Sequence, residues 1–200
     1  MTDSWQGHAK GSRGYSRVLA ALALACCFMP RASAQEKSEV VVRVEIENDT
    51  VRINAEASIA ASAKEVWDVL TDFEKLPRFI SNIAASKVIS RNGNVVRVAQ
   101  TGKAGFGPFS MEFQSTRELT LTPYEKFESR MIEGNMKRFQ GTTRLEEKDG
   151  ITRVRYQSEA VPDTVMPIGL ARSTIESETR EHYVEIGREV MRRKNAGAAR

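Results

Sequence analysis

Two side chains are the main candidates for electrostatic or acid-base chemistry. His182 lies beside Tyr183 in a helical segment, close to its apolar stripe, where an imidazole could donate or accept a proton inside a pocket. Arg117 continues the alternation of Phe113 and Ser115, so it either faces inward and anchors an acidic head group or is turned outward by a bulge or strand end. A lone histidine is more often a boundary residue, and the spacing identifies no carboxylate partner for it. We treat both as candidate polar anchors and predict no catalytic residue.

Motifs of metal and hydrolase chemistry are absent from the sequence. The two cysteines, Cys26 and Cys27, are adjacent, so they provide neither a four-ligand zinc site nor a disulfide framework. No G-x-S-x-G elbow and no H-E-x-x-H pair occurs. Gly102, Gly105 and Gly107 precede a strand and not a helix, which predicts a flexible hairpin tip instead of a phosphate loop. We expect no metal and no cofactor.

Residues 1–34 are predicted to form a secretory signal peptide. Basic side chains precede the apolar run 18–29, and Ala32, Ser33 and Ala34 follow it. The run is shorter than the roughly 20 apolar residues that span a bilayer as a helix. We therefore expect cleavage after Ala34. The alternatives are a buried N-terminal helix, a retained anchor, and a lipoprotein processed at Cys26.

The composition indicates one exported globular domain. Of 200 residues, 40% are hydrophobic and 28% are charged, which is ordinary for a globular protein. The formal charge of +4 depends on the leader, because residues 1–34 contain four basic side chains and one acidic side chain. Residues 35–200 are therefore nearly neutral and have no electrostatic footprint for nucleic acid. We expect this segment to be a single domain in the periplasm or outside the cell.

The first part of this domain alternates between strand and helix patterns. Alternating valines and isoleucines predict a β-hairpin over residues 40–59. Ser62 stands three residues before Glu65, which is the spacing of a capping box, and apolar residues follow at helical intervals as far as Phe73. A short second helix is expected near Pro77, with the proline in its first turn.

A two-residue period then continues for most of the chain. Short segments with turn residues separate the strands, which predicts an antiparallel meander. Residues 167–194 carry apolar side chains three and four positions apart, which predicts one long amphipathic helix. Because both apolar surfaces must be buried, we expect an α+β fold with a curved antiparallel sheet wrapped around the terminal helix. The candidate strands are residues 86–91, 95–103, 108–121, 126–133, 137–147 and 151–160.

The side chains expected on the inner face of the sheet differ from those of an ordinary core. They mix phenylalanine and methionine with glycine, serine and threonine, whereas aliphatic residues usually fill a dense interior. A filled core is the alternative interpretation. The predicted ligand-binding residues are Phe109, Met111, Phe113, Phe127, Met131, Phe139, Tyr156, Ile175, Thr179 and Tyr183.

The chain resembles the START-like or SRPBCC superfamily. The resemblance is carried by the stretch 57–77, ASIAASAKEVWDVLTDFEKLP, by the later FESR at 127–130 and by the glutamate-rich terminal helix. It extends over about residues 51–194 and is greatest to the polyketide cyclase/dehydrase and coenzyme Q-binding branch. It implies a helix-grip fold with a cavity between the sheet and the terminal helix.

Pattern and resemblance together predict an exported binding or carrier protein for a small hydrophobic ligand, such as a lipid, a quinone-like or a polyketide-like compound. One alternative is a cyclase or dehydratase in which His182, Tyr156 or Arg117 moves or stabilises charge. A predicted leader argues against a cytoplasmic cyclase of this kind. Another alternative is a protein-interaction module without a ligand.

The basic end of the terminal helix has two interpretations. Cations stabilise the C-terminus of a helix, and they also allow weak contact with an anionic membrane surface. The side chains concerned are Arg188, Arg192, Arg193 and Lys194.

Overall fold

A computed structural model describes residues 39–106, 109–163 and 168–198, which form a sheet, three short helices and a long terminal helix. The strands and helices expected from the sequence are present. Their bounds are β1 Val40–Glu47, β2 Thr50–Ile59, α1 Ala63–Leu70, η1 Phe73–Arg78, β3 Ile83–Asn92, β4 Val95–Phe106, β5 Phe109–Thr122, β6 Lys126–Gly134, β7 Met136–Lys148, β8 Ile151–Pro162, η2 Ile168–Ala171 and α2 Arg172–Ala198.

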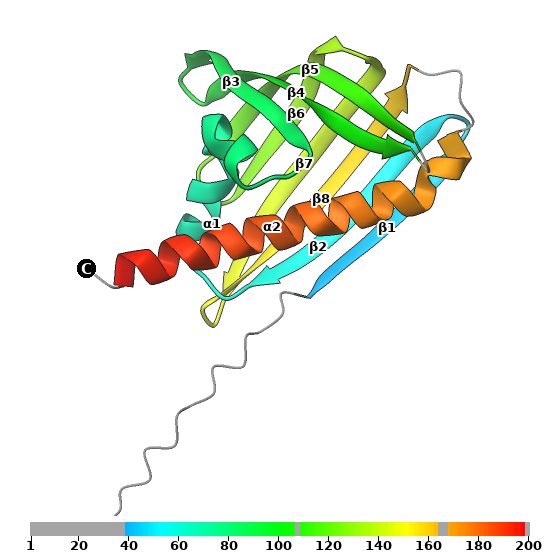
Figure 1. Cartoon of the computed structure of the whole chain (residues 1–200). Coiled ribbons are helices and arrows are strands. Elements are labelled where there is room, and N and C mark those ends of the chain that lie inside the picture. Colours follow the sequence, from blue (N-terminus) through cyan, green and yellow to red (C-terminus); the bar gives the residue numbers. More distant parts are fainter. Residues whose placement is uncertain (1–38, 107–108, 164–167, 199–200) are drawn as a thin grey trace, which may run out of the picture. The chain divides into compact units, whose positions relative to one another are not determined.

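All eight strands pair in one antiparallel sheet (Figure 1). The strand order is β1-β2-β8-β7-β6-β5-β4-β3, so the meander from β3 to β8 is joined to the N-terminal hairpin through β2 and β8. In that pairing Ala55 lies opposite Tyr156, and Ile53 lies opposite Ser158. This one contact between distant parts of the chain completes the sheet.

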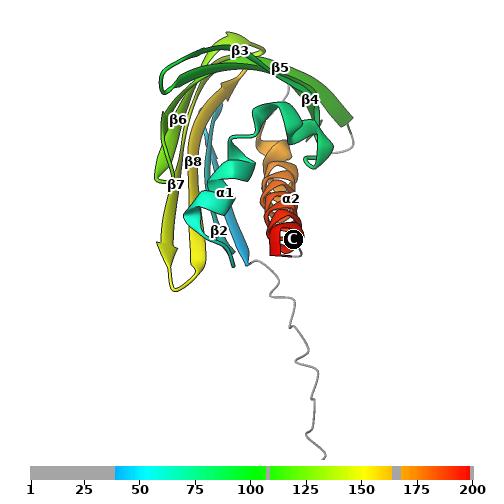
Figure 2. The same cartoon turned by 90° about the vertical axis from the view of Figure 1, so that its left-hand side faces the viewer.

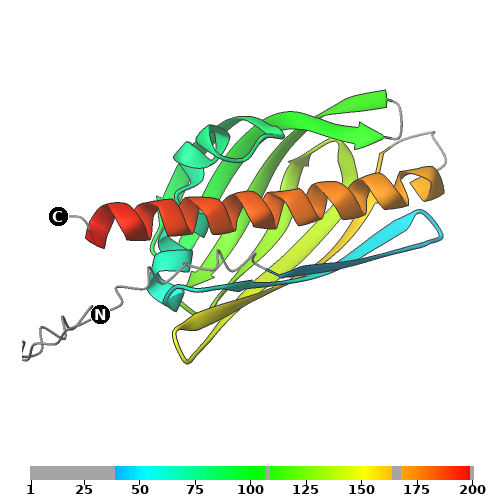
Figure 3. The ribbon, with the colours of Figure 1, turned by 60° about the horizontal axis from the view of Figure 1, so that its bottom comes forward.

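The sheet arches over α2, and this helix runs across its concave face (Figures 2 and 3). Tyr183, Ile186 and Val190 of α2 are buried at three- and four-residue spacings, as an amphipathic helix requires. Inward valines of β1, β4 and β8 form part of the same hydrophobic core. The prediction of a helix-grip fold is confirmed.

The start of α1 shows how local sequence places an element. The Ser62 hydroxyl accepts a hydrogen bond from the Glu65 N–H, and the Glu65 carboxylate accepts one from the Ser62 N–H at 2.8 Å. This capping box satisfies two backbone donors that the first helical turn leaves free. Trp67 is consequently held in the core, where its ring centre lies 6.1 Å from that of Phe127.

Three local predictions need correction. The second short helix is a 3-10 helix that starts at Phe73. Its buried residues Phe73 and Leu76 are one 3-10 turn apart. Pro77 lies near the end of this helix and not in its first turn. The terminal helix extends to Ala198, beyond the predicted end. Gly102 lies inside β4 and not at a flexible tip.

Candidate functional site

A cavity of about 200 Å³ lies between the sheet and α2. Its apolar wall consists of Ile83 from β3, Phe113 from β5, Met131 from β6, and Met136 and Phe139 from β7. These five side chains come from four strands, so only the folded sheet brings them together. The cavity is partly open to solvent, because its rim includes exposed residues of the β6–β7 turn.

Polar groups complete the lining of this cavity. Asn82, Gln100, Ser115 and Asn135 supply amides and a hydroxyl, and Arg117 and His182 supply the titratable groups. No acidic side chain is among the described residues that line the cavity. The cavity therefore combines an apolar wall with a single fixed positive charge.

Arg117 faces this cavity. A bulge in the β5–β6 pairing falls between Thr116 and Arg117, but the guanidinium still lies on the inner face. Its Nη2 donates a hydrogen bond to Oε1 of Gln100, and its Cζ lies 5.7 Å from the centre of the Phe139 ring. Burial lowers the pKa of Arg117.

Among the described residues, Nε of this guanidinium is without a partner. Nε of Arg117 is buried and has no hydrogen-bond acceptor among the described residues. No ion pair between described residues includes Arg117. Gln100 cannot turn easily to serve both donors, because its own Nε2 donates to the Ser86 hydroxyl at 3.1 Å.

His182 reaches the cavity from α2, with its ring centre 5.6 Å from that of Tyr183. Burial lowers the pKa of His182 to about 4, and the positive charge of Arg117 contributes to this shift. The imidazole is therefore neutral near pH 7, and it can accept or donate a hydrogen bond without adding charge.

Tyr156, which is half-buried, lies beside the buried Tyr183. Their ring centres are 6.1 Å apart. Burial raises the pKa of both phenols, so both stay protonated. Neither ring lines the cavity as the structure describes it. Of the three residues considered for charge chemistry, Arg117 and His182 share one enclosed space and Tyr156 lies outside it.

The predicted ligand-binding residues fall into three groups. Phe113, Met131 and Phe139 line the cavity, together with the polar candidates. Phe127 packs against Trp67 instead, and the side chains of Phe109 and Met111 lie outside the described residues. The others do not line the cavity: Tyr156, Ile175 and Tyr183 pack in the hydrophobic core, and the Thr179 hydroxyl donates to the Ile175 carbonyl. Their role in binding stays a prediction.

Sequence reasoning missed several lining residues. Gln100 follows the buried Val96 and Val98 on the same face of β4, so a polar residue in an inward position was the available signal. Asn82, Asn135 and Met136 lie at strand ends, where alternation gives no reliable face.

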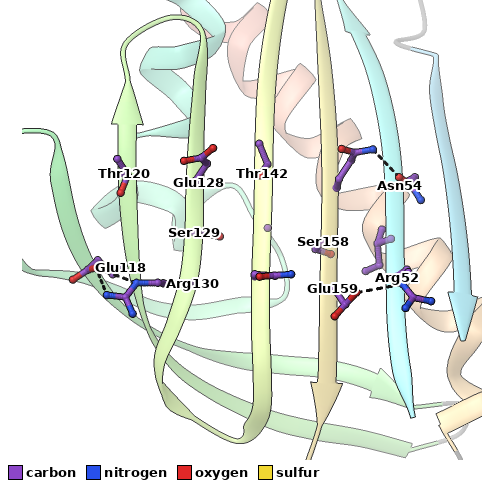
Figure 4. Close-up of a pocket in the computed structure, with 14 residues that line it drawn as sticks. Arg52, Asn54, Glu118, Thr120, Glu128, Ser129, Arg130, Thr142, Ser158 and Glu159 are labelled. Atoms are coloured by element: carbon purple, nitrogen blue, oxygen red, sulfur yellow. Dashed lines mark hydrogen bonds and ion pairs between the residues drawn. The ribbon is translucent and has the colours of Figure 1, made fainter. Parts of the chain in front are cut away.

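A larger depression of about 620 Å³ lies on the outer face of the sheet (Figure 4). Its side chains project from β2 and from β5 to β8 on the side away from α2. They largely satisfy one another, since Glu118 pairs with Arg130 at 2.6 Å and Glu159 pairs with Arg52 at 3.3 Å. No aromatic or methionine side chain is among the described residues that line it. This depression suits water better than an apolar ligand.

Two other kinds of site receive no support from the described residues. No group of three or more histidine, cysteine, aspartate or glutamate side chains among them is arranged to hold a metal ion. None of their helices combines the length and the apolar character that crossing a membrane requires.

The sequence over residues 59–182 matches the family model for polyketide cyclase/dehydrase and lipid transport. The chain belongs to this family. Membership agrees with the START-like resemblance and with the helix-grip fold, in which this family binds hydrophobic ligands. A comparison with curated proteins finds no match.

Several solved structures have the same fold at low sequence identity. A STAR-related lipid transfer protein from Xanthomonas axonopodis is 18% identical, with a TM-score of 0.63 over 80% of this chain and 97% of its own. The Zhui aromatase/cyclase from Streptomyces is 16% identical, with a TM-score of 0.60 over 72% and 95%. Human STARD10 is 13% identical, with a TM-score of 0.63 over 84% and 78%.

Proposed function

We propose that this protein binds and carries a small hydrophobic molecule in the cavity between the sheet and α2, after export from the cytoplasm. The observation that carries the proposal is the cavity wall, in which Phe113, Met131 and Phe139 from three strands face one space on the helix side. Burial of a guest there would supply affinity of about 25 cal/mol for each Å² of apolar surface removed from water.

The volume of the cavity sets a condition on this function. About 200 Å³ is less than the roughly 300–1,000 Å³ of most small-molecule sites. A long ligand therefore requires the wall to yield. Met131 and Met136 are suited to this, because unbranched thioether side chains change rotamer at low cost.

The family contains both carriers and cyclases, and three features favour a carrier here. The neighbour from Xanthomonas is a lipid transfer protein, and the predicted leader would remove this chain from the compartment of cytoplasmic biosynthesis. Tyr156 interacts electrostatically with Arg117 but does not line the cavity, so fewer of the described groups in the cavity are available to move protons. The ligand classes considered from the sequence were lipid, quinone-like and polyketide-like compounds, and a lipid fits these features best.

The alternative of an interaction module without a ligand would use exposed apolar surface. The most exposed large apolar side chain described is Leu170, at 73%, and the others lie on different strands and turns.

The basic end of α2 is engaged within the protein. Arg193 pairs with Glu189 and Asp72, and the Lys194 ammonium donates to the Ala60 carbonyl. Membrane contact through this end stays a prediction.

Binding is tested with a matched pair of variants in one strand. Ser115 lines the cavity, whereas Thr116 is its neighbour on the opposite face of β5. We expect Ser115→Phe to fill the cavity and to abolish binding of 1-dodecanol in titration calorimetry, and Thr116→Phe to bind as the wild type does. Equal binding by both variants, or no binding by the wild type, would contradict the proposal.

Export is tested separately. Mass spectrometry of the protein recovered from producing cells should give a chain that starts at Gln35. A lipid-modified chain that starts at Cys26 would support the lipoprotein alternative, and an intact leader on functional protein would contradict export.

A further inference from the structure

We propose that the ligand is an amphiphile with a carboxylate head group, which pairs with Arg117 inside the cavity. This inference rests on the proposed function, because it identifies the chemical class of the molecule carried.

Arg117 differs from the other partly buried charged side chains in its partners. Other charged groups in partly buried positions have partners, as Glu189 has in Arg192 and Arg193, and as Glu118 has in Arg97 and Arg130. Among the described residues, the hydrogen-bond and ring partners of Arg117 are the neutral Gln100 oxygen and the face of the Phe139 ring. A buried cation without a counter-ion is costly, and an anionic guest would remove that cost on binding.

The N–H donors of the Arg117 guanidinium are arranged to fit a carboxylate. The unpartnered Nε shares one edge of the guanidinium with Nη2, and Nη2 carries two hydrogens, so it can donate to Gln100 and, parallel to Nε–H, to one further acceptor. This arrangement matches the two oxygens of a carboxylate, and such paired contacts are shorter and stronger than those between neutral groups.

The titratable groups around Arg117 do not neutralise its charge. The titratable residues that interact electrostatically with Arg117 are Tyr156 of β8 and His182 of α2, and Tyr183 of α2 lies beside both of them. None of them is negative near pH 7, because burial raises the pKa of both phenols and lowers that of the imidazole. Since no acidic side chain lines the described cavity, the counter-ion must come from the ligand.

The charge count also distinguishes a carboxylate from a phosphate monoester. Arg117 is the single cation among the described lining residues. A phosphate monoester carries about −1.5 to −2 charges near neutral pH, so it would leave negative charge uncompensated in the cavity. A carboxylate is neutralised by one guanidinium.

The test compares three amphiphiles with the same tail: laurate, 1-dodecanol and dodecyl phosphate. Titration calorimetry at pH 7 on the full mature chain should give a Kd for laurate about 10–100-fold lower than for dodecanol, as a charge-assisted pair provides. Arg117→Met should remove this preference. Arg97→Met, which removes an exposed arginine of the outer face, should keep the preference.

Three other results of the calorimetry would overturn parts of the proposal. Laurate binding no tighter than dodecanol, or a preference that survives in Arg117→Met, overturns the inference while the carrier function stands. Tightest binding of dodecyl phosphate overturns the carboxylate assignment. Failure of the wild type to bind any of the three overturns both the inference and the proposed function.

A second readout does not depend on affinity. His182 is the one histidine in the described part of the chain, so its imidazole resonances are simple to assign by NMR. Burial and, to a smaller extent, the charge of Arg117 lower the pKa of His182, so a bound carboxylate that offsets this charge should raise that pKa. Dodecanol at saturation should not raise it to the same extent. An identical pKa with both ligands would place the carboxylate away from Arg117.

Discussion

At the scale of a single residue, we expect the charge of Arg117 to lower the stability of the protein without ligand. Removing the charge while keeping an apolar side chain of similar length should stabilise the fold, because an uncompensated buried donor costs about 1–3 kcal/mol. We expect Arg117→Met to raise the free energy of unfolding by about that amount in urea titrations without ligand. A loss of more than about 1 kcal/mol would mean that the guanidinium is already compensated.

His182 gives a prediction with a defined sign. Its pKa is about 4 in the folded protein and 6.5 when exposed, so below pH 6.5 the unfolded chain binds a proton that the folded chain does not. Stability should therefore fall as the pH is lowered from 6.5 toward 4. His182→Gln should lose less stability over this range in thermal unfolding measured at several pH values. Parallel curves for the two proteins would contradict a neutral, buried imidazole.

At the scale of elements, Glu189 pairs with Arg192 and Arg193 within α2, and Arg193 also pairs with Asp72 next to η1, which anchors the helix. Hydrogen bonds from these arginines lower the pKa of Glu189 to about 2, so its contribution is present above the ordinary value of 4.5 and is lost as the pH falls through 2. Because Arg192 is solvent-exposed, we expect Glu189→Gln to cost only about 1–2 kcal/mol near neutral pH.

The control for this variant is Glu181→Gln, which removes a pair with Arg188 that is exposed on both sides. It should change the unfolding free energy by less than about 1 kcal/mol. If the two glutamine variants were equally stable at every pH, the anchoring role of Glu189 would be wrong.

Gly102 shows how two strands shape the cavity. A Cβ at this position would lie 2.1 Å from the Asn82 carbonyl and 2.6 Å from the Phe113 ring. The missing side chain lets Phe113 lie flat on β4 and form part of the wall. Gly102→Ala should destabilise the fold by about 1–3 kcal/mol and weaken ligand binding, whereas Gly169→Ala, which faces open space, should do neither.

The same elements show what a sequence can and cannot predict. Alternation predicts the strands and the inward face, because the side-chain period of a strand is fixed. It does not predict how far along a strand the cavity lies. Phe127 and Met131 share an inner face, yet Phe127 packs on Trp67 and Met131 reaches the cavity. The bulge beside Arg117 and the pairing of β2 with β8 depend on contacts between distant segments.

At the scale of the whole molecule, the sheet presents two depressions with opposite chemistry. The inner one is smaller, with an apolar wall and one unpaired cation, whereas the outer one is larger and its charged groups neutralise one another. Size alone would favour the outer face. A hydrophobic ligand favours the inner cavity, because its affinity comes from apolar surface removed from water.

The most direct measurement is the location of a bound ligand on the protein in solution. Nuclear Overhauser effects between isotope-labelled laurate and the methyl and ring protons of the protein report such contacts. The account predicts contacts from the ligand chain to Phe113, Met131 and Phe139. Contacts to Thr120 and Thr142 in the outer depression, with none to the inner wall, would contradict it.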